Sequence, residues 1–158
     1  MRINSLSPQL WFGVGLLMLA SCVGQPAETG WLAQAPPLQS EMARAWVLRM
    51  PSQAGITTGA DPMVYVNGAP LAQSTLSTAY FHDFRPGTYR FTVQPYGTPG
   101  NLVDTVELAP GTQTYLQVQA VPNWEMGSTA GGASFAVITM SPEIAKPYLP
   151  TMKYLGER

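Results

Sequence analysis

The sequence has little charge and almost none of the residue types that bind transition metals. Charged residues make up 11% of its 158 residues, less than half of the roughly 25% found in typical soluble proteins. Eight Lys and Arg against nine Asp and Glu give a net charge of −1, so no basic surface for nucleic acid is expected. A single Cys excludes an intrachain disulfide.

Binding motifs for metals and cofactors are also missing. One His and one Cys cannot form a transition-metal site. No Asp-rich calcium loop is present, and no glycine-rich phosphate loop follows a strand after the N-terminal apolar segment. We therefore expect no metal and no cofactor.

Glycine and proline are abundant, with 15 residues of each. This content excludes a helical bundle and favours short strands joined by tight turns. The length predicts one domain.

The first 21 residues are typical of a bacterial lipoprotein signal peptide. The apolar run at 10–20 is shorter than the roughly 20 residues of a membrane-spanning helix, but it has the length of a signal-peptide core. Leu19-Ala20-Ser21-Cys22 then resembles a lipobox, in which the peptidase cuts before the cysteine and the sulfur carries lipid. The alternative is a buried cysteine within a simple secretory signal. Fatty acids such as palmitate on Cys22 would anchor the protein to the membrane.

The residue after the cysteine predicts the destination. Val23 stands where enterobacterial lipoproteins retained in the inner membrane carry Asp. For a Gram-negative host we therefore expect an outer-membrane lipoprotein that faces the periplasm.

The next segment is predicted to be a flexible tether. Residues 23–40 contain three Pro, two Gly and one charged residue, too little apolar surface to become ordered alone. Its adjacent apolar residues Trp31 and Leu32 either dock on the folded domain or enter the bilayer interface. The predicted organisation is a signal peptide (1–21), a lipidated cysteine and linker (22–40), a folded domain (41–140), and a short helix with a tail (141–158).

Residues 41–140 predict a mainly β domain, a single prealbumin-like or immunoglobulin-like β-sandwich of about seven strands. Alternation of apolar and polar residues is clearest at 88–94, where Tyr89, Phe91 and Val93 should face the core. The predicted strands are 43–49, 62–68, 77–82, 88–94, 102–108, 114–121 and 134–140.

Three turns and one helix accompany these strands. Asn67-Gly68 predicts a tight turn. The Pro-Gly segments 85–88 and 109–112 both predict type II turns with glycine at positive φ. Ser141-Pro142-Glu143 predicts the start of a short helix, followed by an aromatic tail that packs along a sheet edge.

The order of several motifs resembles one family of lipoproteins. Trp46-Val47-Leu48-Arg49, Val64-Tyr65-Val66-Asn67-Gly68, Ala79-Tyr80-Phe81, Pro86-Gly87-Thr88-Tyr89 and the segment 108–116 follow one another as in the family of domain of unknown function 2846. The resemblance covers roughly residues 43–121 and extends to PEGA-type and carboxypeptidase-regulatory-like modules. It implies a small prealbumin-like sandwich used as a surface or stalk domain, without catalytic residues. The connection 51–61 is longer than usual for the family, so its role stays open.

Catalytic residues are hard to find. His82-Asp83 is the one suggestive dipeptide, but neighbouring side chains of a strand point to opposite faces. We expect His82 to be a surface or loop-bonded histidine. A pair of carboxylates for glycan cleavage would have to come from Asp83, Asp104, Glu107 or Glu125, and the sequence favours none of them.

The strongest candidate for a binding site is Trp124 with Met126, which lie beside a glycine-rich segment. These side chains suit contact with a partner, although packing over one end of the sandwich is the alternative. The sequence thus predicts a lipid-anchored, non-catalytic binding or structural module of the cell envelope, with an envelope protein or a glycan as partner. The alternative is a small hydrolase-like envelope enzyme.

Overall fold

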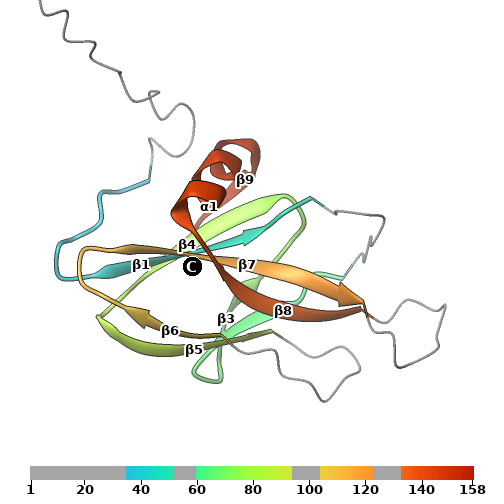
Figure 1. Ribbon diagram of the computed structural model, residues 1–158, viewed down its shortest axis with the longest axis horizontal. Helices are drawn as coiled ribbons and strands as arrows, with labels where there is room; N and C mark the ends of the chain where they lie inside the picture. Colours follow the sequence, from blue (N-terminus) through green and yellow to red (C-terminus); the bar gives the residue numbers. More distant parts are fainter. Residues whose placement is uncertain (1–34, 52–59, 94–103, 123–132) are drawn as a thin grey trace, which may run out of the picture.

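Strand β1 (Ala43–Arg49) is buried on both of its faces and forms the centre of the structure (Figure 1). The structure is a computed structural model, and residues 35–51, 60–93, 104–122 and 133–158 are described. Apolar residues occupy both faces of β1, with Ala45 and Val47 on one and Trp46 and Leu48 on the other. This pattern is typical of a strand covered by a layer on each side.

The first layer is a five-stranded sheet with the strand order β8-β7-β1-β4-β9. Its other members are β4 (Thr78–Phe84), β7 (Gln113–Pro122), β8 (Ala133–Met140) and β9 (Lys153–Glu157). β1 pairs antiparallel with β4 but parallel with β7, and β9 pairs parallel with β4. The sheet is therefore mixed.

The second layer is a four-stranded antiparallel sheet with the order β3-β2-β5-β6. Its members are β2 (Met63–Val66), β3 (Ala69–Gln73), β5 (Gly87–Val93) and β6 (Asp104–Leu108). The two sheets face each other, so the predicted β-sandwich is confirmed.

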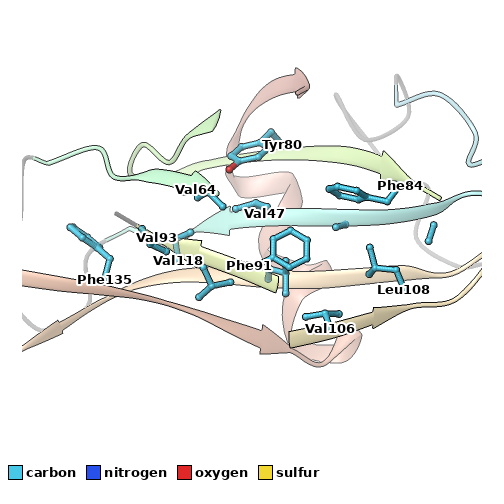
Figure 2. Packing of buried hydrophobic residues seen from close by; sticks show 14 residues of the cluster. Val47, Val64, Tyr80, Phe84, Phe91, Val93, Val106, Leu108, Val118 and Phe135 are labelled. Atoms are coloured by element: carbon cyan, nitrogen blue, oxygen red, sulfur yellow. The ribbon is translucent and has the colours of Figure 1, made fainter. Parts of the chain in front are cut away.

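The inner core lies between the two sheets. Phe91 of β5 is fully buried at its centre, with Val47 of β1 and Val64 of β2 close to it (Figure 2). The rings of Phe84 and Phe91 meet in a T-shaped arrangement at a centroid distance of 5.9 Å. The predicted inward direction of Phe91 and Val93 is thus confirmed, and Tyr89 is partly buried against the same core.

A third layer covers the outer face of the five-stranded sheet, the face turned away from the second sheet. It consists of α1 (Pro142–Tyr148) and the 3₁₀ turn η3 (Leu149–Thr151), seen in red in Figure 1. Ala145, Leu149 and Met152 pack there on an aromatic group from β1, β4 and β7. We call these buried residues the outer cluster: Trp46, Leu48, Met50, Ala79, Phe81, Tyr115, Ala145, Leu149 and Met152.

The start of α1 agrees with its sequence. Ser141 is the N-cap and Pro142 the first helical residue, where a missing N–H costs nothing. The pKa of Glu143 is lowered because its carboxylate accepts hydrogen bonds from the Glu143 backbone N–H and from the Ser141 side chain. The predicted short helix is confirmed.

Seven of the strands were predicted and two were not. The prediction placed β1 at its observed bounds, but it missed β3 and β9 among the nine strands of the described residues. β3 was missed because it contains Pro70, and proline is uncommon within a strand. The proline is tolerated here because β3 lies at the edge of its sheet. The tail was expected along a sheet edge and does lie there, but as the strand β9, whose pairing with β4 contains a register shift.

The predicted turns are confirmed except for the type of one. Asn67 (φ 51°) and Gly68 (φ 85°) both have positive φ and join β2 to β3, as in a type I′ hairpin. Gly111 has φ 69°, and the N–H of Thr112 donates to the carbonyl of Ala109, which fits the predicted type II turn. Gly87 has φ 156°, far from the roughly +80° of that turn type, so the prediction for 85–88 was wrong.

Candidate functional site

The two ends of the sandwich are built differently. At one end β4 is joined to β5 by residues 85–86, and β6 to β7 by residues 109–112; we call this the turn end. At the other end lie the connection 74–77 and the strand ends that border residues 50–62, 94–103 and 123–132; we call this the loop end. Figure 1 shows β1 and β7 pointing toward the same end, which is the loop end. Connections that start from one end of a rigid sandwich are a common location for binding sites.

A buried arginine lies beneath the loop end. Arg49, the last residue of β1, is 3% exposed. Its guanidinium donates hydrogen bonds to the carbonyls of Ala60 and Ser74 and lies 3.4 Å from a carboxylate oxygen of Asp61. The guanidinium carbon is also 5.0 Å from the centroid of Phe135. Arg49 thus ties β1 to β8 and to the chain beside β2 and β4, and gives the loop end a fixed base.

A second buried arginine lies on the outer face near the turn end. Arg44 binds Asp83 through two parallel hydrogen bonds of 2.7 Å, from Nε to Oδ1 and from Nη2 to Oδ2. Its guanidinium carbon is 3.8 Å from the Phe81 centroid, a distance typical of a cation–π contact. Its Nη1 donates to the carbonyl of Pro36 at 2.8 Å.

The Pro36 contact shows where the N-terminal segment joins the domain. Ala35 packs on the outer cluster. Met42 accepts a hydrogen bond from the N–H of Gly111 at 2.7 Å, and the N–H of Arg44 donates to Thr112. The segment before β1 therefore enters the sandwich at the turn end, opposite the loop end.

Aromatic rings continue the site around Arg44. The Trp46 and Phe81 rings meet edge to face at 5.0 Å, and Tyr154 of β9 stacks on Phe81 at 6.0 Å. The indole N–H of Trp46 donates to Gln113 at 2.7 Å. Burial raises the pKa of Tyr154, the Arg44 charge opposes that shift, and the carboxylates of Glu157 and Asp83 add to it.

The His82-Asp83 dipeptide is divided between two faces of the sheet, as its place in a strand predicted. Asp83 faces outward to Arg44. His82 faces inward, with its ring 4.5 Å from that of Phe84. The expectation of a surface or loop-bonded histidine was wrong, because His82 is half-buried and its Nδ1 has no hydrogen-bond partner among the described residues.

The carboxylates suggested for glycan cleavage are not brought together. Asp83 lies on the outer face of the five-stranded sheet. Glu107 alternates with the inward-facing Val106 and Leu108, so it points away from the core on the opposite side of the sandwich. Asp104 pairs with Phe91 in the second sheet, and Glu125 lies outside the described residues.

The other predicted site residues lie outside the described part of the chain. These are the lipobox residues Leu19, Ala20 and Ser21, the lipidation residue Cys22, and the contact residues Trp124 and Met126. The strands that flank Trp124 and Met126 are described, and both meet the connection 123–132 at the loop end.

Sequence analysis missed Arg44 and Arg49 as buried residues. A signal was present, because the segment 43–49 carries apolar residues on both faces. A strand of this kind is covered on both sides, so an arginine within it must be buried and needs a partner.

A buried tyrosine on the inner face also lacks a partner. Tyr80 is 1% exposed, and its hydroxyl has no hydrogen-bond partner among the described residues. Burial raises the pKa of Tyr80 well above its ordinary value, with a smaller opposing effect from the Arg158 charge. The hydroxyl is therefore neutral at physiological pH.

Within residues 35–51, 60–93, 104–122 and 133–158 there is no group of three or more His, Cys, Asp or Glu side chains that could hold a metal ion. In the same part of the chain, no helix is long and apolar enough to cross a membrane. No protein-family model matches the chain, and no curated protein or solved structure is significantly similar to it.

Proposed function

We propose that the protein is a lipid-anchored cell-envelope protein whose β-sandwich is a non-catalytic binding or structural module. The segment Leu19-Ala20-Ser21-Cys22 supports the anchor. One observation carries the proposed role: the chain enters the sandwich at the turn end, whereas its long connections leave from the loop end. A domain anchored in this way presents the loop end away from the membrane.

The dimensions of the domain fit this arrangement. β1 has seven residues between the two ends, so at about 3.3 Å per residue it separates them by roughly 20 Å. The 12 residues between Cys22 and Ala35 have a root-mean-square span of roughly 20 Å if they are flexible. The loop end could then contact a partner that lies in the envelope beyond the surface of the bilayer.

The chemistry of the loop end favours a protein partner. The segments 52–59, 94–103 and 123–132 contain one charged residue, Glu125, and are rich in Gly, Ser and Thr. Trp124 and Met126 belong to the residue types enriched at protein interfaces. We therefore propose that an envelope protein binds there through Trp124, and we treat a glycan as an outcome of the test.

A catalytic role is less well supported. The two buried charged side chains of the described residues, Arg44 and Arg49, are engaged in ion pairs and in hydrogen bonds to backbone carbonyls. His82 and Asp83 point to opposite faces, and Glu107 is remote from both. The kinship with the domain of unknown function 2846 lipoproteins stays a proposal based on residues 43–121.

The first experiment tests the anchor by intact mass. The mature protein should begin at Cys22 and carry the mass of its acyl chains. Cys22→Ser should abolish fatty-acid labelling without changing the thermal melting of the sandwich. A mature protein that begins elsewhere, or that begins at Cys22 without lipid, would refute the anchor.

The second experiment tests the binding end by photocrosslinking in intact cells. A photoreactive phenylalanine replaces Trp124 at the loop end, and the matched control replaces Thr112, which is exposed at the turn end. We expect a discrete protein adduct from position 124 that Met126→Ala weakens, and none from position 112. Equal adducts from both positions, or none from either, would overturn the proposed orientation. An adduct that only glycan-degrading enzymes remove would identify a glycan instead.

A further inference from the structure

Two large apolar side chains are exposed on one flank of α1. Ile144 is 56% exposed and Tyr148 is 38% exposed. They are four residues apart, so they are neighbours on the surface of the helix. Each directly precedes a buried residue, Ala145 or Leu149, that packs on the outer cluster. The flank is therefore an apolar surface that the described residues leave open to water.

The N-terminal segment joins the domain on the same side of the five-stranded sheet. Ala35, the first described residue, packs on the outer cluster, and the carbonyl of Pro36 accepts a hydrogen bond of 2.8 Å from Arg44. In Figure 1 the first described residues (blue) and α1 (red) lie on the same side of this sheet. The chain that precedes Ala35 is thus attached at the layer to which α1 belongs.

The residues just before Ala35 include side chains that suit this surface. Trp31 and Leu32 precede Ala35 by four and three residues. At about 3.5 Å per residue, the backbone of Trp31 can lie up to about 14 Å from that of Ala35. The seven residues of α1 span only about 10 Å. Because Ala35 and α1 contact the same cluster, the exposed flank of α1 is within reach of Trp31.

Chain length favours the domain over the bilayer as the environment of Trp31. Trp31 is four residues from Ala35, which is fixed on the domain, and nine residues from Cys22, the proposed lipid anchor. A shorter connection gives a higher effective concentration of the two partners and costs less conformational entropy when they meet. Burial of an indole ring against a tyrosine ring and an aliphatic side chain then stabilises the contact.

We propose that Trp31 and Leu32 dock on Ile144 and Tyr148 of α1. The docked segment extends the third layer of the sandwich and leaves residues 23–30 as the free part of the linker. Docking does not rest on the proposed function, because both partners belong to one chain and no lipid is needed.

Intramolecular photocrosslinking of the full chain in phosphatidylcholine vesicles tests the docking. A photoreactive phenylalanine replaces Trp31, and the matched control places it at Gln25, six residues farther from the domain. After irradiation, mass spectrometry identifies the attached residues. We expect the main adduct of position 31 on α1 and no α1 adduct from position 25. Ile144→Lys should abolish the adduct, whereas Thr88→Lys, which places the same charge on an exposed position of β5, should leave it intact.

Several outcomes would overturn the docking. A main adduct on lipid would place Trp31 in the bilayer interface, and a main adduct on another protein or on another part of the sandwich would identify a different contact. Equal α1 adducts from positions 25 and 31, or an adduct that survives Ile144→Lys, would show that the contact is not specific.

A Cys22→Ser variant separates the docking from the lipid anchor. The α1 adduct of position 31 should persist in this variant, because the contact lies within the chain. Failure of the anchor therefore leaves the adduct in place. Loss of the adduct in Cys22→Ser alone would contradict docking, since the contact would then depend on the membrane.

The fluorescence of Trp31 gives a second measurement that needs no crosslinker. The difference between the wild type and Trp31→Phe isolates the emission of Trp31 from that of the other tryptophans. We expect this emission to be shielded from acrylamide, with the shielding lost in Ile144→Lys and kept in Thr88→Lys. Brominated acyl chains in the vesicles should leave it unquenched. Quenching by those chains, or free access of acrylamide in the wild type, would contradict docking on α1.

Discussion

Removal of Asp83 should destabilise the domain more than removal of its partner Arg44. The Arg44 side chain is 4% exposed, whereas that of Asp83 is 18% exposed. Asp83→Ala leaves the guanidinium buried with the Pro36 carbonyl and the Phe81 and Trp46 rings as its described contacts. Loss of one member of a buried ion pair costs about 3–5 kcal/mol, and because Asp83 is partly exposed the lower end of this range applies. We expect a loss of about 3 kcal/mol.

Substitution of the other member of the ion pair, Arg44, provides the comparison. Arg44→Met keeps an apolar side chain against Phe81 and leaves a carboxylate that reaches water more easily, so its cost should be smaller. The double variant should lose no more stability than Asp83→Ala alone, because replacing both members of a buried pair leaves no stranded charge. The two substitutions should therefore be strongly non-additive.

Urea denaturation followed by circular dichroism measures these differences. The slope of the transition should stay constant while its midpoint moves. A loss below about 1 kcal/mol for Asp83→Ala would mean that Arg44 is not held as described. A double variant that loses the sum of the single losses would refute the coupling of the pair.

Three further predictions concern the inner core and the turns. Phe91→Ala should cost about 3–5 kcal/mol because Phe91 is fully buried, and a near-wild-type melting temperature would contradict its place in the core. Gly111→Ala should cost about 1 kcal/mol and Gly111→Asn less, since Asn tolerates the φ of 69°. At Gly87 the φ of 156° suits neither side chain, so urea midpoints should fall equally for Ala and Asn. Tyr80→Phe should stabilise the domain by about 1 kcal/mol at neutral pH, because it removes a buried hydroxyl that has no hydrogen-bond partner among the described residues. Above pH of about 10 the free energy of unfolding of the wild type should fall, because Tyr80 ionises in the unfolded state but stays neutral in the folded state. Tyr80→Phe should lose less of this free energy between pH 8 and pH 11. Equal losses in the two proteins would argue against the raised pKa of Tyr80.

The inner core was largely predictable because it follows local alternation. The segment 88–94 showed which of its side chains face inward, and the Asn67-Gly68 turn was recognisable from two residues. Parallel pairing has no such local signature, so the strand at 153–157 and its pairing with β4 were not predicted. Long-range partners such as Asp83 for Arg44 likewise depend on which strands become neighbours, which the local sequence does not specify.

For the candidate contact residues, the sequence predicted only their position between two strands. The sequence placed Trp124 and Met126 between two strands, and strand direction then assigns that connection to the loop end. The contrast between the two ends arises from β1 running parallel to β7. It could not be inferred before the strand order was known.

The pairing of β4 with β9 has a consequence for the order of folding. α1, η3 and β9 come after all the remaining strands along the chain. They nevertheless complete the burial of Trp46 in β1 and Phe81 in β4. Until these segments have been synthesised, the outer face of β1 and β4 stays open and its aromatic rings meet water. Contacts between residues so far apart in sequence form slowly, and exposed apolar surface in the meantime invites aggregation. We therefore expect the nascent chain to depend on a holding chaperone until α1 and β9 have emerged.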